Sequence, residues 1–169
     1  KALKEQLAPL MASLQQKGLK LGVRKQYEEV FRELQDTLDG VQSAATEIQA
    51  MLEGTFRQLN AEFGFSLQVP AAPQLQEFGN EIARIEQGHL QYLGMGNTLK
   101  LLQPEFAERL GRALSIRLRS VYESVANDLE LWSKSATAQL DAQLRERKRS
   151  FARRIGAVDR IRQAATGRE

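Results

Sequence analysis

The chain has 169 residues and a net charge of +3, with 27% charged residues, only four prolines and no cysteine. This composition is typical of helical, coiled-coil-rich proteins. The lack of cysteine excludes disulfides and thiolate metal sites and fits a reducing, cytoplasmic compartment. No apolar run approaches the roughly eighteen residues of a membrane-spanning helix. Because the chain starts at Lys1 rather than at a methionine, we expect a fragment of a longer protein.

Leucines spaced by three or four residues predict a first helix over residues 2–17. A second apolar pattern begins at Val23, nine residues after Leu14. Nine steps of about 100° turn the apolar face by half a revolution, so one continuous helix would point its two stripes in opposite directions. Gly18 and Gly22 supply a flexible break between them. We therefore expect the first helix to fold back along the second.

The second helix is predicted over residues 23–63, with inward positions that include Phe31, Leu34, Leu38, Ala45, Ile48, Leu52 and Phe56. Pro70 and Pro73 forbid helix in the loop at residues 64–73. A short third helix is predicted over residues 74–88, followed by an apolar stretch at residues 89–96 that is punctuated by glycines.

The last third of the chain predicts one helix over residues 104–165, which is roughly 90 Å long at 1.5 Å per residue. Pro104 suits the first helical position, and no proline follows it. Apolar residues return every three or four positions at Phe106, Leu110, Leu114, Leu118, Val121, Val125, Leu129, Trp132, Ala136, Leu140, Leu144, Phe151, Ile155, Val158 and Ile161. Such a helix must form one rail of an extended assembly.

These elements predict an all-α fold, an elongated antiparallel helical bundle or coiled coil that forms one stalk-like domain over residues 1–169. We expect the second and last helices to run antiparallel, so that Val23 lies near Arg145. About twenty residues of the last helix then extend beyond the turn at Gly18–Gly22, and they lack a partner within the chain.

The charges are unevenly distributed. Residues 145–162 hold eight arginines and lysines against two acids, a net +6, whereas residues 28–62 hold eight acids against two arginines, a net −6. The basic segment fits a solvated helix face, a protein interface, or a surface for nucleic acid or anionic lipid. Its single aromatic residue argues against nucleic acid. The candidate interface residues are Arg145, Arg147, Lys148, Arg149, Phe151, Arg153, Arg154, Ile155, Val158 and Ile161.

Catalytic patterns are missing from the sequence. The glycines at residues 94–96 are not followed by the lysine of a phosphate-binding loop. His89 is the only histidine, which leaves no histidine-based metal site or catalytic triad with a helper. We therefore expect no enzyme activity, metal or cofactor. The stretch at residues 89–96 either closes one end of the bundle or forms a membrane-touching tip through Leu90, Tyr92, Leu93 and Met95.

From Tyr92 onward the sequence resembles the C-terminal helical region of bacterial dynamin-like large GTPases. The resemblance is carried by Tyr92-Leu93-Gly94, Gly96-Asn97, Gln103-Pro104, Phe106, Arg109-Leu110, Asp128-Leu129-Glu130-Leu131-Trp132, Gln143-Leu144-Arg145-Glu146-Arg147 and Arg153-Arg154-Ile155. In that family a GTPase domain is followed by a helical stalk that relays nucleotide state into self-assembly and, in several members, membrane remodelling. No GTPase motif is present here, so no GTP-site residue is transferred.

The resemblance implies a non-catalytic stalk that mediates self-assembly and coupling to a GTPase domain outside this sequence. The partner would be a second copy or the remainder of the parent chain. Two alternatives stay open: a membrane-associating helical protein that uses residues 89–96, peripheral to the membrane, and a free-standing coiled-coil scaffold.

Overall fold

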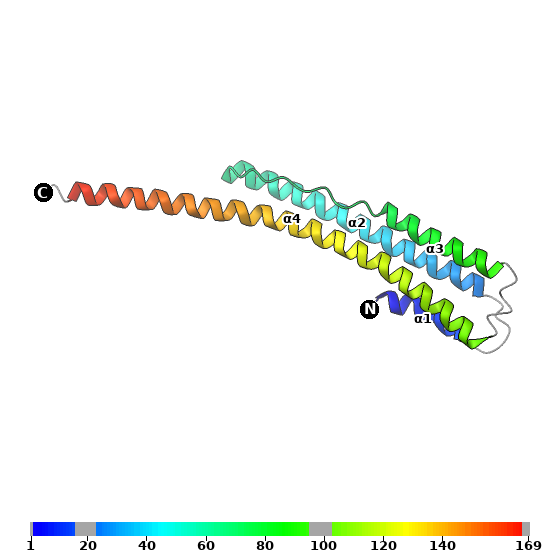
Figure 1. Cartoon of the computed structure of the whole chain (residues 1–169). Coiled ribbons are helices and arrows are strands. Elements are labelled where there is room, and N and C mark those ends of the chain that lie inside the picture. The colour runs from blue at the N-terminus through cyan, green and yellow to red at the C-terminus, as the bar shows by residue number, and fades with distance from the viewer. Residues whose placement is uncertain (1, 16–22, 95–102, 167–169) are drawn as a thin grey trace. The chain divides into compact units, whose positions relative to one another are not determined.

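The computed structural model describes every residue except 1, 16–22, 95–102 and 167–169. Its helices are α1 (Ala2–Gln15), α2 (Val23–Phe63), α3 (Gln76–Gly94) and α4 (Pro104–Thr166) (Figure 1). The described residues contain no strand. The prediction of an all-α helical bundle with one long C-terminal helix is therefore confirmed.

The chain divides into two compact units, and the prediction that residues 1–169 form one stalk-like domain stays a prediction. Unit 1 comprises Lys1–Thr46 and Pro73–Leu129, and unit 2 comprises Glu47–Ala72 and Glu130–Glu169. Both α2 and α4 contribute residues to each unit. The predicted bounds of these two helices, 23–63 and 104–165, agree with the observed ones to within one residue.

In unit 1, apolar side chains from all the helices form one core. Its largest fully buried members are Leu10, Tyr27, Phe31, Leu34, Leu75, Ile82, Ile85, Leu114 and Leu118. The side chain of Gln6 on α1 donates a 2.8 Å hydrogen bond to Thr37 on α2, so α1 lies back along α2 as predicted. The glycine break that was expected to allow this lies outside the described residues.

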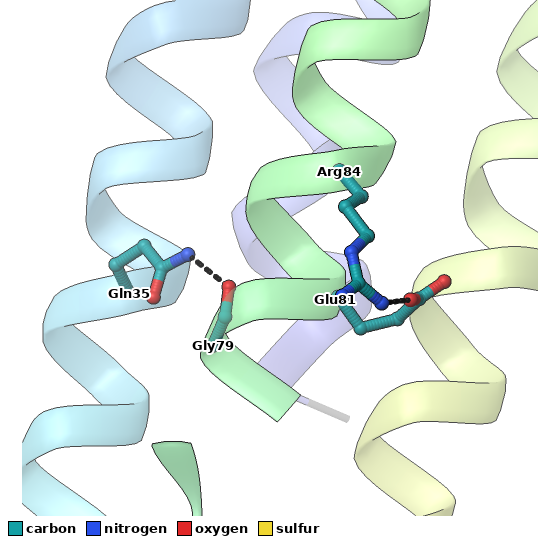
Figure 2. Close-up of polar contacts among 4 residues, drawn as sticks. All are labelled: Gln35, Gly79, Glu81 and Arg84. Atoms are coloured by element: carbon teal, nitrogen blue, oxygen red, sulfur yellow. Dashed lines mark hydrogen bonds and ion pairs between the residues drawn. The ribbon is translucent and has the colours of Figure 1, made fainter. Parts of the chain in front are cut away.

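Helix α3 runs antiparallel to α2. The Gln35 side chain donates a 2.9 Å hydrogen bond to the carbonyl oxygen of Gly79 near the start of α3 (Figure 2). At the other end of α3, the ring of His89 stacks on Tyr27, with 6.0 Å between the ring centroids. Figure 2 also shows the solvent-exposed Arg84–Glu81 ion pair on the side of α3 away from Gln35.

The predicted antiparallel pairing of the second and last helices is wrong, because α2 and α4 run parallel. The last turns of α3 contact the first turns of α4, where the rings of Tyr92 and Phe106 lie 6.0 Å apart. Farther along α4, the Tyr122 hydroxyl donates a 2.9 Å hydrogen bond to the carbonyl oxygen of Leu34. Since α3 is antiparallel to both neighbours, α2 and α4 must share one direction.

In unit 2, an extended return segment (residues 64–72) runs back between α2 and α4. Asn60 on α2 makes two 2.9 Å hydrogen bonds with the backbone of Leu67. On the α4 side, the indole N–H of Trp132 donates a 2.9 Å bond to the carbonyl oxygen of Pro70, and Gln139 accepts one from the amide of Gln68. Side-chain amides and the indole thus replace the ladder bonds that this extended backbone would find in a sheet.

The length of the connection explains the error in direction. A 41-residue helix such as α2 is about 62 Å long. About ten extended residues at roughly 3.3 Å each, followed by the 19 residues of α3, cover about the same distance. The connection therefore returns along α2 to the end where α2 begins, and α4 starts from that same end.

Three glutamines on one face of α2 bind the backbone of the chain that runs back along it, from the return segment to the start of α3. Gln35 and Gln42 bond to Gly79 and to the amide of Leu75 in unit 1, at 2.9 and 2.8 Å. In unit 2, Gln49 accepts a 2.8 Å bond from the amide of Ala72. The three positions are spaced by seven residues, which places them on the same side of the helix.

Helix α3 begins at Gln76 and ends at Gly94, whereas residues 74–88 were predicted. Gly88 was expected to end the helix, but a glycine inside a helix costs only about 1 kcal/mol. His89, with 8% of its surface exposed, is buried beyond it, and Leu90 packs against the core of unit 1. This burial outweighs the cost of one glycine.

The glycines of unit 2 provide a matched pair of substitutions with opposite expected signs. Gly64 ends α2 with a φ of 60°, and an added Cβ would lie 3.0 Å from Nη2 of Arg147. We expect Gly64→Ala to lower the free energy of unfolding by about 1–2 kcal/mol, because alanine resists left-handed backbone. Gly54, inside α2 with open space around it, should gain up to about 1 kcal/mol as alanine.

Urea unfolding of both variants, followed by circular dichroism, tests this pair. An equal effect of the two substitutions would contradict the role assigned to the positive φ of Gly64.

Candidate functional site

The candidate site is the end of α4 that carries the predicted interface residues. Four apolar side chains follow one another there at spacings of three or four residues, and we call them the C-terminal stripe. They are 57%, 61%, 62% and 71% exposed, in the order Phe151, Ile155, Val158 and Ile161. Their helical spacing places these four apolar side chains on one exposed face of α4.

The packing of α4 in unit 2 changes at Arg147. Its guanidinium carbon lies 5.1 Å from the ring centroid of Phe65, a cation–π contact just beyond the end of α2. Before this point Trp132 and Ala136 are buried, whereas all four residues of the stripe are exposed. Figure 1 shows α4 continuing past the end of α2.

The basic side chains around the stripe mostly face water. Arg153 pairs with Glu146 at 3.1 Å, but both side chains are more than 60% exposed, so the pair contributes at most about 1 kcal/mol. The remaining predicted interface cations divide into half-buried Arg147 and the exposed residues Arg145, Lys148, Arg149 and Arg154. The segment therefore joins an exposed apolar stripe to an excess of positive charge. Its role as an interface stays a prediction.

The predicted tip at residues 89–96 is not a loop over its described part, because α3 continues through Gly94. Leu90 packs against the core of unit 1, and Tyr92, although 42% exposed, stacks on Phe106. The side chain of Leu93 and the whole of Met95 lie outside the described residues. Leu90 and Tyr92 thus join α3 to its neighbours rather than forming a separate apolar projection.

An open pocket of about 510 Å³ lies between α3 and α4 in unit 1. It is lined by Gly88, His89, Tyr92, Phe106, Arg109, Leu110, Ala113 and Arg117. His89 forms its buried wall, and the Nδ1 atom of this histidine has no hydrogen-bond partner within the described part of the chain. Burial lowers the pKa of His89, and the positive charge of Arg117 lowers it further.

His89 should make the fold sensitive to acid. The folded chain resists protonation of the buried ring, whereas an unfolded histidine binds a proton at a pKa of about 6.5. The unfolded state therefore takes up the proton first, and stability falls as the pH drops below about 6.5. We expect His89→Gln to lose less stability than the unmutated chain between pH 7.5 and pH 5.5.

Urea unfolding at the two pH values measures this difference. Burial and Glu28 raise the pKa of Glu86, which acts in the opposite direction, but Glu86 is present in both proteins and cancels from the comparison. Equal losses for the two proteins would exclude His89 as the source.

Reasoning from the sequence missed a second exposed apolar surface, on α2. Ile48 was assigned to the inward stripe, yet it is 48% exposed, and nearby Met51 is 72% exposed. The sequence did hold evidence for an exposed Met51, because its helical position differs from those of the inward residues Leu52 and Phe56. The exposure of Ile48 could not be recognised, because its spacing matches that of the inward positions.

No group of three or more metal-ligating side chains occurs among the described residues. Within the same residues, no helix is long and apolar enough to cross a membrane. The chain matches no family model, no curated protein and no solved structure.

Proposed function

We propose that this chain is the non-catalytic helical stalk of a dynamin-like GTPase, and that it mediates self-assembly and coupling to a GTPase domain supplied outside this sequence. The resemblance in the C-terminal half motivates the family. The exposed C-terminal stripe on α4 carries the proposal of self-assembly. A continuous helix of 63 residues that contributes to both units suits the transmission of a conformational state.

Burial of the stripe supplies the driving force for assembly. Covering an aliphatic side chain contributes about 1.5–3 kcal/mol relative to leaving it in water. Ile155 and Val158, which are 61% and 62% exposed, lie in the middle of the stripe. We expect the double variant Ile155→Asp, Val158→Asp to weaken association by about 3 kcal/mol, which is roughly a hundredfold.

Analytical ultracentrifugation over a wide concentration range tests this expectation. A matched control is the double variant Ile116→Asp, Leu131→Asp, since these residues are 63% and 66% exposed on α4 but lie outside the stripe. The control should associate like the unmutated chain. A monomeric unmutated chain at all concentrations, or equal association of the stripe variant, would refute self-assembly through this surface.

A further inference from the structure

Several large apolar side chains of unit 2 are exposed, and besides the C-terminal stripe two of them lie close together on α2. We call this pair the α2 patch; it consists of Ile48 and Met51, 48% and 72% exposed and three residues apart. Glu47, four residues before Met51, is exposed on the same side of the helix. Around Gly54, three residues after Met51, an added Cβ would meet nothing within 4 Å, so this side of the helix is open to a partner.

Charge argues against pairing of two stripes. Residues 145–162 of α4, which we call the tail, carry a net charge of +6. A contact between the tails of two copies therefore brings two strongly positive segments together. At physiological salt the screening length is about 8 Å, and charges in direct contact across an interface are closer than that. Two tails therefore repel each other where their stripes would meet.

The segment of α2 that carries the patch has the opposite charge. Within unit 2, residues 47–72 hold three acids, Glu47, Glu53 and Glu62, against one arginine, Arg57, a net −2. The α2 patch and the C-terminal stripe are therefore complementary in two properties: both are apolar, and the charges around them have opposite signs. Opposite charges across an interface also fix which surfaces meet.

The tail cannot reach the α2 patch of its own chain. Within unit 2, α2 and α4 run in the same direction, and Arg147 contacts Phe65 just past the end of α2. The stripe follows Arg147 on an unbroken helix that runs to Thr166, so it continues away from Met51. A partner for the tail must come from another molecule.

We infer that the C-terminal stripe of one copy docks on the α2 patch of a second copy. This inference rests on the proposed self-assembly and names the surface that receives the tail. The contact joins two different surfaces, so it either occurs twice in a closed dimer or repeats along an open chain of copies.

A complementation experiment tests the inference with two variants of the full chain. The tail variant is Ile155→Asp, Val158→Asp, and the patch variant is Ile48→Asp, Met51→Asp. All four positions are at least 48% exposed, so both variants should keep their helical content, which circular dichroism checks. Each variant alone should stay monomeric at concentrations where the unmutated chain associates.

Mixing the two variants should restore one contact, because the patch variant keeps an intact tail and the tail variant keeps an intact patch. Sedimentation of the mixture should show a complex that stops at two chains. Association of the unmutated chain should also weaken severalfold from low to high salt, because attraction between opposite charges is screened.

The alternatives give different results. If the patch variant associates as strongly as the unmutated chain, or if association strengthens with salt, the tails pair with each other. The inference then fails while the proposed self-assembly stands. A mixture that remains monomeric also overturns the inference. An unmutated chain that is monomeric at every concentration overturns the proposed function as well.

Discussion

Replacing Trp132 with alanine is expected to lower the free energy of unfolding by about 3–5 kcal/mol. The indole is only 9% exposed and fills the space between α4 and the return segment, where its N–H bonds to the carbonyl oxygen of Pro70 at 2.9 Å. Alanine removes both the packing and the hydrogen bond. Because unit 2 has few other large buried side chains, among them Phe56 and Leu67, it has little capacity to compensate.

Hydrogen exchange locates this effect within the chain. The amides of Leu67 and Gln68 bond to the side chains of Asn60 and Gln139, and they should lose protection first in Trp132→Ala. Trp132→Phe keeps most of the ring and removes the donor, so it should cost only about 1 kcal/mol. Equal losses for the two variants would show that the hydrogen bond, rather than the packing, holds the return segment.

Phe31→Ala should destabilise the chain by a similar amount, about 3–5 kcal/mol, through unit 1. Phe31 is completely buried, and its ring stacks on Tyr27 with 6.2 Å between the centroids. It also belongs to the core cluster in which α1, α3 and α4 pack against α2. Truncation leaves a cavity that helices fixed on several sides cannot close.

Thermal and urea unfolding followed by circular dichroism measure the loss. Ile116→Ala is the control, because Ile116 is 63% exposed on α4, lies outside the C-terminal stripe, and its truncation should change stability by less than about 0.5 kcal/mol. If the two variants unfold at the same urea concentration, Phe31 does not have the structural role assigned to it.

The helices could be predicted because their apolar spacing and their end signals agree. Pro104 begins α4, Gly64 ends α2, and Pro70 and Pro73 exclude helix from the segment between α2 and α3. Glycine inside a helix is a weaker signal, and for this reason Gly88 misled the prediction for α3. The cost of one glycine cannot be compared with burial until the neighbours of His89 are known.

The direction of α4 relative to α2 could not be predicted from the apolar pattern, which is the same for parallel and antiparallel helices. The evidence lay in polar residues. Gln42 and Gln49 look like ordinary surface glutamines in the sequence, yet they bond to the returning backbone. The start of the unpaired tail was nevertheless predicted near residue 145, because α2, with its 41 residues, pairs with a similar length of α4 in either direction.

The three glutamines of α2 have a consequence for alignment along the helix. Apolar contacts that recur every three or four residues are nearly preserved when one element slides past another by a single helical turn. The hydrogen bonds between Gln35, Gln42 and Gln49 and single backbone groups of Gly79, Leu75 and Ala72 are not preserved by such a slide. Each bond lost in this way costs about 0.5–1.5 kcal/mol. The glutamines thus disfavour slips by one turn, and because they are uncharged, this selection should persist across pH and salt conditions that change the charged tail.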